Sequence, residues 1–466
     1  MAQQHNRKPL RLNAFEMASV GHIAHGLWTH PRDRSSHYAD LEHWIDLART
    51  LERGKFDGIF IADVSGIYDV YKGGPETAIR SAIQVPILDP LLIVPAMAAV
   101  TKHLGFGVTA NLSHEQPYLF ARRFSTLDHL TKGRIAWNIV TGFLDSSAKG
   151  AGLARQTAHD LRYDRADEFL EVVYKLWEGS WNDDAVVRDR VRRVYAEPER
   201  VRAIQHAGPH FSLDAIHLSE PSPQRTPLLF QAGASSRGLD FAARHGECVF
   251  LPGSKSDGAA VTADLRRRVV AGGRSPDDVL VFGSLQPVVG RNEKEARDKF
   301  EDYRRYAEPE AGLAQFSSAI GVDLSRFDPD EPISEIKGDG IRSLAQSISA
   351  KEGSSAWTVR QLKESMTLGG RFTPLIGSPE RIADEMARQS EAFDLDGFNL
   401  VRTVSPESFE DFIDLVVPVL QERGLFKADY SEGTLRHKLF GRDRLSGAHA
   451  GAAFQARANT LAGGEP

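Results

Sequence analysis

Eight apolar, strand-like runs recur in order along this chain of 466 residues, and this repeat restricts the folds that are open to it. Seven runs are followed by a segment with helical patterning, and the run at 56–63 is followed by a long loop with four prolines. Strands that alternate with helices are typical of parallel sheets covered by helices. The runs occupy residues 10–15, 56–63, 104–112, 133–142, 226–233, 247–253, 279–290 and 398–403.

The number of units favours a closed barrel over an open, doubly wound sheet. Eight units match the repeat of a (β/α)8 barrel. An open sheet that binds a dinucleotide carries a G-x-G-x-x-G turn after its first strand. That motif is absent, because GFGVTA at 105–110 and GAGLAR at 150–155 do not match it, and there is no Walker A motif. We therefore predict an α/β fold, a TIM barrel, without a Rossmann site for a nicotinamide cofactor.

Two long segments, about 182–225 and 308–375, do not follow the alternation. Barrels of about 250 residues form one domain, and long segments of this kind are often functional insertions. We predict a single barrel domain over residues 1–440 that carries both insertions. The segment 441–466, in which Gly and Ala are frequent, is expected to be a flexible tail.

Composition excludes several classes of function. The net charge is −6 and the basic residues are scattered, so no nucleic-acid partner is expected. Cys248 is the only cysteine, which excludes an intrachain disulfide and a Cys-rich metal site. No segment reaches the roughly 18 apolar residues of a membrane span, and the N-terminus lacks the apolar core of a signal peptide. The sequence therefore predicts a cytoplasmic protein that does not bind membranes.

Polar residues close several of the predicted strands. Asp63 ends the second run, Thr109 lies in the third, and Asn138 and Thr141 lie at the end of the fourth. In parallel α/β folds the chemistry is found at the carboxyl ends of the strands. We expect these side chains to share one site at the mouth of the barrel.

The fifth run ends in QAGASSRG at 231–238, a glycine turn followed by hydroxyls at the start of a helix. Free backbone N–H groups and the helix dipole at such a turn suit a phosphate. The alternative is that Ser235 only caps the helix. His159 and Tyr163, at the start of the helix after the fourth run, could also donate to a phosphate, or could simply pack at the helix entry.

Three histidines, His22, His25 and His30, follow the first run. Together with Asp63 they could form a metal site. Barrel hydrolases that bind metal need two histidines one residue apart on a strand, and an H-x-x-H spacing on a loop does not provide that. No metal is expected, and His22 is a candidate for the wall of the site or for a proton donor.

Longer blocks of sequence resemble a known family. They match the bacterial-luciferase-like flavin monooxygenases, and within them the nitrilotriacetate/dibenzothiophene-sulfone monooxygenase branch, from about residue 10 to 440. The blocks are LNAFEM (12–17), GHIAHGLW (21–28), LERGKFD (51–57), ADVSGIYDVY (62–71), TLDHLTKGRIAWNIVT (126–141), YKLWEGSW (174–181) and EPSPQRTP (220–227).

The resemblance implies reduced FMN as cofactor, O2 as co-substrate and oxygen activation through a flavin C4a-(hydro)peroxide. A separate NAD(P)H:FMN reductase would supply the flavin, and a homodimer or homotetramer is expected. Asp63 and Asn138 would lie near the isoalloxazine, and Tyr163 and the 231–238 turn would bind the phosphate, with either Ser235 or Ser236 in contact. The flavin-binding positions matched by motif are Asp63, Thr109, Asn138, His159, Tyr163 and Ser235.

Three positions depart from the family pattern. Members that act on alkanes or sulfides often have Cys at the position of Ser19, Ser at that of Gly142, and His or Tyr at that of Phe143. These are expected to be substrate-pocket positions, and with His22 we take Ser19 and Phe143 as the catalytic candidates.

We hypothesise a two-component FMN-dependent monooxygenase that oxygenates a small or medium organic substrate, such as an alkane, an organosulfur compound or a xenobiotic. Three alternatives remain open at this point. They are a deazaflavin-dependent oxidoreductase on the same barrel, a metal-dependent barrel hydrolase, and a non-catalytic barrel that binds flavin or another ligand.

Overall fold

A closed ring of eight parallel strands forms the centre of the computed structural model, which describes residues 9–233, 235–251, 258–330, 332, 357–368 and 372–455. Around the ring, each strand pairs with the next, β13 pairs with β1, and each predicted run overlaps one of the eight strands. The predicted TIM barrel is therefore confirmed. The strands are β1 (Arg11–Met17), β2 (Gly58–Ala62), β3 (Gly105–Asn111), β4 (Ile135–Val140), β9 (Leu228–Gln231), β10 (Cys248–Phe250), β11 (Leu280–Val289) and β13 (Gly397–Val401).

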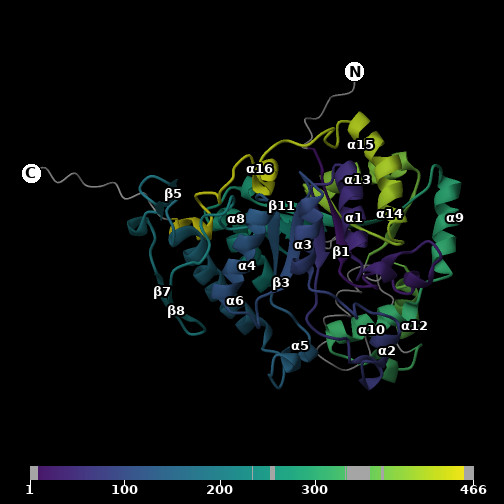
Figure 1. Cartoon of the computed structure of the whole chain (residues 1–466). Coiled ribbons are helices and arrows are strands. Elements are labelled where there is room, and N and C mark those ends of the chain that lie inside the picture. The colour runs from purple at the N-terminus through teal and green to yellow at the C-terminus, as the bar shows by residue number, and fades with distance from the viewer. Residues whose placement is uncertain are drawn as a thin grey trace, which may run out of the picture.

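Helices surround this ring (Figure 1). Those that follow the strands are α1 (Leu41–Arg53), α4 (Pro117–Leu130), α6 (His159–Tyr174), α7 (Ser236–His245), α8 (Gly258–Ala271), α9 (Glu293–Arg304), and α14 (Glu407–Asp411), which continues through a π-helical turn into α15 (Val417–Glu422). Helix α13 (Pro379–Phe393) precedes the last strand, and β12 (Pro374–Gly377) pairs with β11 outside the ring. Within the described residues, no helix combines the length and apolarity of a membrane span.

The expectation of a long, proline-containing loop after the second strand is wrong in part, because residues Pro90–Ala99 form helix α3. Pro90 occupies the first turn of the helix, where the missing N–H costs nothing. The Asp89 carboxylate accepts a hydrogen bond from the N–H of Leu91 at 2.9 Å and so caps the helix. Prolines that suggest a loop are here compatible with a buried, apolar helix.

Aromatic side chains fill the inside of the barrel. The Phe15 ring lies 5.6 Å from that of Phe60 and 5.3 Å from that of Phe250, and Phe60 lies 5.3 Å from Phe230. Helix α16 (Leu435–Phe440) adds Leu435 and Leu439 to the same cluster. A Cβ added at Gly105, the first residue of β3, would lie 2.7 Å from Leu435, so α16 covers the end of the barrel opposite the mouth.

A second apolar cluster lies over the loops that leave β2 and β4. Helices α2 (Glu76–Arg80), α10 (Pro309–Ile320) and α12 (Val359–Ser365) meet there, at the lower right of Figure 1. The cluster joins Tyr68 and Leu144 of these loops to Leu313 and Met366. The described part of the segment expected to be the 308–375 insertion is therefore packed beside the carboxyl ends of the strands. Residues 331, 333–356 and 369–371 of that segment lie outside the described residues.

The segment expected to be the first insertion, 182–225, contains two antiparallel hairpins, β5 (Val186–Asp189) with β6 (Val194–Ala196) and β7 (Ile204–Ala207) with β8 (Ser212–Ala215).

Residues 441–455, expected to belong to a flexible tail, instead pack against the barrel. His449 is buried and its Nε2 bonds the carbonyl of His245 at 2.9 Å. The expectation of a tail is wrong for these residues because polar contacts, rather than an apolar periodicity, attach them. Residues 456–466 lie outside the described residues.

A buried ion pair connects α16 to the wall of the barrel. Arg436, which is 0% exposed, binds both carboxylate oxygens of Glu247, at 2.8 and 2.9 Å, and the carbonyls of Thr226 and Pro227. Burial opposes the charge on Glu247, but Arg436 outweighs burial and holds the pKa of this carboxyl below its ordinary value. The pair is thus fully charged inside the protein.

We expect Arg436→Met to lower the free energy of unfolding by about 3–5 kcal/mol, because it leaves a buried carboxylate without its partner. Lys294→Met is the control, because it breaks an exposed pair with Asp298 on α9 that contributes about 0.5 kcal/mol or less. Urea denaturation of both variants measures the difference. Equal losses in the two would contradict a structural role for the pair.

Candidate functional site

A polar pair stands at the mouth of the barrel, above the phenylalanine cluster. Thr109 on β3 and Asn138 on β4 are register partners, and Asn138 in turn is in register with Phe230, which faces the interior. The Asn138 Nδ2 donates to Thr109 Oγ1 at 2.8 Å. Asn138 is 4% exposed, and its Oδ1 has no hydrogen-bond partner among the described residues. A buried, unpaired acceptor is costly and points to a ligand that donates to it.

Asp63 follows β2 directly and is half-buried. Burial and, to a smaller extent, the Asp89 carboxylate raise its pKa to about 6, although the N–H of Val64 acts in the opposite sense. A carboxyl that titrates near neutral pH can hold or release a proton under ordinary conditions. Asp63 is thus suited to exchange a proton at the site near neutral pH.

Three of the predicted flavin-binding residues meet at the start of α7. Ser235 caps this helix, accepting from the N–H of Gly238 at 3.0 Å, and His159 Nε2 lies 3.4 Å from its hydroxyl. A Cβ added at Gly238 would lie 3.0 Å from the Tyr163 hydroxyl, so the Tyr163 side chain reaches the first turn of the helix. Ser235 does cap the helix, and this cap leaves the other first-turn N–H groups directed at the same place as Tyr163 and His159.

Arg237 is a basic residue at this turn, and two carboxylates balance its charge. Its guanidinium lies 5.5 Å from the centre of the Tyr163 ring and is paired with Asp164 and Asp167. Burial raises the pKa of Tyr163, so its hydroxyl stays protonated and can donate. The arrangement of donors suits a phosphate that is partly open to solvent.

A chain of hydrogen bonds that the motif analysis missed connects His22 to the loop after β2. The Tyr68 hydroxyl donates to Gln84 Oε1 at 2.6 Å, and Gln84 Nε2 donates to the carbonyl of His22 at 2.8 Å. The His22 ring is buried against Phe15, with 4.5 Å between the ring centres. The signal in the sequence was the block ADVSGIYDVY, which contains Tyr68; Gln84 has no recognisable motif around it.

The two other histidines of the first loop, His25 and His30, bind different helices. His25 Nε2 bonds Gln315 Oε1 on α10 at 3.1 Å, and His30 Nε2 bonds Asp302 on α9 at 3.1 Å. In the described part of the chain, no group of three or more His, Cys, Asp or Glu is arranged to hold a metal ion.

Ser19 and Gly142, which depart from the family pattern, both have structural roles in this protein. The Ser19 hydroxyl is buried and donates to the carbonyl of Gly21 at 3.0 Å. Gly142 has a φ of +64°, and a Cβ there would lie 2.6 Å from the Asn111 amide. In this protein a side chain at position 142 would displace Asn111. Thr141 is buried, and its carbonyl accepts from Ser113 at 2.6 Å.

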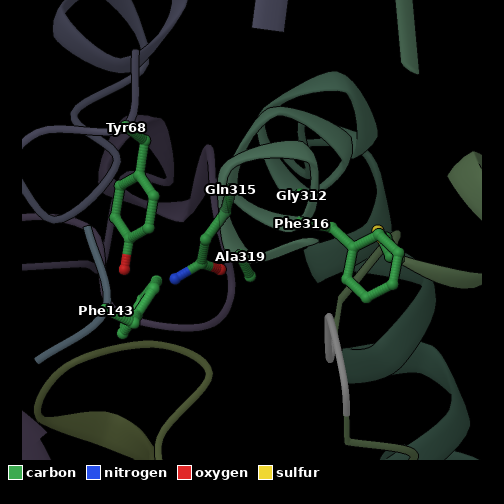
Figure 2. Close-up of a pocket in the computed structure, with 7 residues that line it drawn as sticks. Tyr68, Phe143, Gly312, Gln315, Phe316 and Ala319 are labelled. Atoms are coloured by element: carbon green, nitrogen blue, oxygen red, sulfur yellow. The ribbon is translucent and has the colours of Figure 1, made fainter. Parts of the chain in front are cut away.

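Phe143 lines a cavity of about 170 Å³ between the loop after β4 and helix α10. Figure 2 shows the Tyr68 hydroxyl, the Phe143 ring and the Gln315 amide on one side of this cavity, with the Phe316 ring on the other. The lining residues are Tyr68, Phe143, Gly312, Gln315, Phe316, Ala319 and Met366. Tyr68 therefore connects the cavity with His22.

The geometry brings six of the nine predicted residues into three groups at the carboxyl ends of the strands. Thr109 and Asn138 form the central pair, His159, Tyr163 and Ser235 form a group suited to an anion, and Phe143 joins Tyr68 at a cavity. Asp63, Ser19 and His22 belong to none of these groups, and the roles assigned to all nine candidates stay predictions. The fold and the site are those of an α/β-barrel enzyme with an apolar floor, a polar rim and an edge whose donors suit an anion.

Comparison with known proteins agrees with this class. Residues 23–394 match the luciferase-like monooxygenase family. The chain is 46% identical to dimethyl-sulfide monooxygenase of Hyphomicrobium sulfonivorans, covering 96% of this chain and 94% of the relative. It is 47% identical to long-chain alkane monooxygenase of Geobacillus thermodenitrificans, covering 96% and 98%.

Solved structures are also similar. A crystal structure of long-chain alkane monooxygenase has a TM-score of 0.90 at 47% identity, with 96% of this chain and 100% of that chain covered. Riboflavin lyase, solved with modified FMN and riboflavin, has a TM-score of 0.89 at 36% identity, with 97% and 100% covered. The chain belongs to the luciferase-like monooxygenase family and is an oxidoreductase. The predicted branch is confirmed, because dibenzothiophene-sulfone monooxygenase and nitrilotriacetate monooxygenase component A are among its relatives.

The raised pKa of Asp63 generates a prediction for Asp63→Asn. The folded protein holds the Asp63 proton more tightly than the unfolded chain does, so stability is present at low pH and lost as pH rises from about 4 through about 6. The amide does not titrate. We expect the variant to match the wild type near pH 4 and to be more stable near pH 8, by up to about 3 kcal/mol for a shift of about two units.

Thermal unfolding of both proteins across this pH range measures the effect. Asp46→Asn, which changes an exposed carboxylate on α1, is the control and should show no such divergence. A constant difference between Asp63→Asn and the wild type at every pH would contradict the assignment.

Proposed function

We propose that this protein is the oxygenase of a two-component system that uses reduced FMN and O2 to oxygenate a small or medium organic substrate. One observation carries the proposal: the buried, unpaired Asn138 Oδ1 lies at the mouth of a barrel whose rim also holds the Ser235, Tyr163 and His159 cluster. A ligand with a donor-bearing ring and an anionic end would satisfy both features.

The residues present fit FMN. The Asn138 amide, whose orientation is set by its bond to Thr109, offers a free acceptor to a ring N–H. The first turn of α7, Tyr163 and His159 supply donors for the phosphate. Gly233 keeps this edge open, since a Cβ there would lie 2.6 Å from the Gln231 amide and 3.1 Å from the Tyr163 hydroxyl.

Reduced FMN, when bound, supplies the electrons with which O2 is activated, and the protein supplies orientation and a dry site. Asn138 and Thr109 orient the ring, and the phenylalanine cluster beneath them excludes water from below. The cluster of α2, α10 and α12 covers the loops on the opposite side. Asp63 is placed to hold or release a proton near neutral pH, and His22 is a second candidate for that role.

The relatives support the partners of this proposal. Riboflavin lyase was solved with modified FMN, and the nitrilotriacetate relative is named as component A of its enzyme. We infer that a separate NAD(P)H:FMN reductase supplies the reduced flavin. A homodimer or homotetramer and a cytoplasmic location stay predictions.

The direct test is a substrate screen with an added FMN reductase, in which incorporation of isotopically labelled O2 is followed by mass spectrometry. Alkanes, organosulfur compounds and aromatic xenobiotics form the panel. Incorporation of label that depends on reduced FMN is the expected result. Anaerobic hydride transfer from a deazaflavin, or activity abolished by a chelator, would instead support one of the two alternative enzymes; flavin binding without any turnover would support a binding protein.

Two substitutions test the phosphate assignment. Tyr163→Phe and Ser235→Ala should each weaken FMN binding by about 1–2 kcal/mol, or about 5–30-fold in Kd, because each removes a hydrogen bond to a charged group. Ser235→Ala should also destabilise the protein by about 1 kcal/mol, because Ser235 caps α7. Fluorescence titration with FMN measures the affinity.

Matched controls separate binding from stability. Ser378 caps α13 in the same way, through the N–H of Arg381, and Tyr195 is an exposed tyrosine that binds Glu220. Ser378→Ala and Tyr195→Phe should leave the FMN affinity unchanged. The phosphate assignment is wrong if neither Tyr163→Phe nor Ser235→Ala alters that affinity.

Phe143→His tests the substrate pocket. Phe143 is 46% exposed and lines the cavity, so we expect the variant to alter the ratio of kcat/KM between two substrates by about tenfold or more while changing FMN affinity less than about twofold. Leu153→His, at another exposed apolar position in the segment after β4, is the control. A larger effect on FMN affinity than on substrate preference would place Phe143 in the flavin site.

A further inference from the structure

The cavity beside Phe143 is chemically asymmetric. Among the described residues that line it, none carries a charge, and Phe143, Phe316, Ala319 and Met366 contribute apolar side chains. Its polar lining groups are the Tyr68 hydroxyl and the Gln315 amide, which Figure 2 shows on the same side. With about 170 Å³ it lies below the roughly 300–1,000 Å³ of sites for drug-sized ligands, which indicates a small substrate.

A hydrogen bond with His25 fixes the orientation of the Gln315 amide. Its Oε1 bonds His25 Nε2 at 3.1 Å. Burial lowers the pKa of His25, so the ring is neutral and carries one proton. His25 Nδ1 is buried without a partner among the described residues. An orphaned N–H is rarer in proteins than an under-satisfied acceptor, so the proton belongs on Nε2, where it is donated to Gln315 Oε1.

It follows that the Gln315 amide nitrogen, not its oxygen, faces the cavity. Figure 2 shows this nitrogen directed toward the side where Tyr68 and Phe143 lie. The Tyr68 proton is donated to Gln84 Oε1 at 2.6 Å, so this hydroxyl does not supply the cavity with a second donor. Among the described side chains that line the cavity, the Gln315 amide therefore presents N–H donors, with the apolar side chains of Phe143, Phe316 and Met366 around it.

We propose that Gln315 is a specificity-determining residue, and that it selects a neutral substrate with an apolar body and at least one hydrogen-bond acceptor oxygen, of the kind carried by sulfones and ketones. The proposal rests on the proposed function in that the cavity is taken as the substrate site. It disfavours carboxylates and ammonium ions, because the cavity offers neither of them a counter-charge. It also separates sulfones and ketones from alkanes and sulfides, which leave the amide without an acceptor.

Equilibrium binding tests the proposal without turnover. Dipropyl sulfone and dipropyl sulfide have the same alkyl chains and differ in the acceptor oxygens. Their dissociation constants are measured by calorimetry for the full-length protein saturated with oxidised FMN, and again without FMN. The test compares the ratio of the sulfone and sulfide dissociation constants in each variant with the same ratio in the wild type. The difference in hydration of the two probes is the same in every protein, so it cancels in this comparison.

Gln315→Met keeps the length of the side chain and removes the amide. It should weaken binding of the sulfone by about tenfold, as expected for one lost neutral hydrogen bond, and leave binding of the sulfide within about twofold. Phe316→Leu, which trims the apolar wall, is the matched control and should weaken both probes alike. Gln315→Leu replaces the Met variant if the latter loses its cooperative thermal transition.

An unchanged ratio of the two constants in Gln315→Met, or binding of neither probe to the wild type, would overturn the proposal. Failure of the proposed function gives a different result, because it appears as absence of oxygen incorporation in the screen while the binding ratio still responds to Gln315. The two failures are therefore distinguishable.

Discussion

Closure of the parallel ladder is the constraint on which the remaining structure depends. Because β13 pairs with β1 and β10 pairs with β11, no strand of the ring has an open edge, and all eight carboxyl ends lie around one mouth. A ring of eight strands leaves an interior just wide enough for side chains, here the phenylalanines of β1, β2, β9, β10 and β11. The interior is therefore a packed floor, and space for a ligand exists only above it.

The polar groups of the site are placed where that floor ends. The side chains of Thr109 and Asn138 face the interior from β3 and β4. Along each strand they are the next interior positions toward the mouth after Gly107 and Ala136. Hydrogen bonding between them uses one N–H of the amide and leaves its oxygen buried, without a partner among the described residues. This acceptor is the physical basis for proposing a flavin site.

Much of the fold was predictable from the sequence, since the order of the strands follows from apolar runs bounded by polar tips. Helix α3 was missed because Pro90 and Pro95 resemble loop residues, although Pro90 sits in a first turn capped by Asp89. Residues 441–455 were missed because they attach through buried polar contacts such as that of His449, which leave no periodic pattern. Asp63, Thr109, Asn138 and Tyr163 were recognisable as candidates because each stands at or just beyond a strand end, or within a family motif.

The sequence by itself determined the barrel, the family and the residues at the strand ends, because these depend on patterns among neighbouring positions. Only the tertiary structure decided which of them meet. His25 and Gln315 are 290 positions apart, and Tyr68, Gln84 and His22 come from different loops. The contact between His25 and Gln315 arises from the packing of α10 against the loops after the strands, and no local pattern encodes a contact between segments so far apart. The direction of the Gln315 amide, and with it the polarity of the cavity, is therefore a property of the folded chain alone.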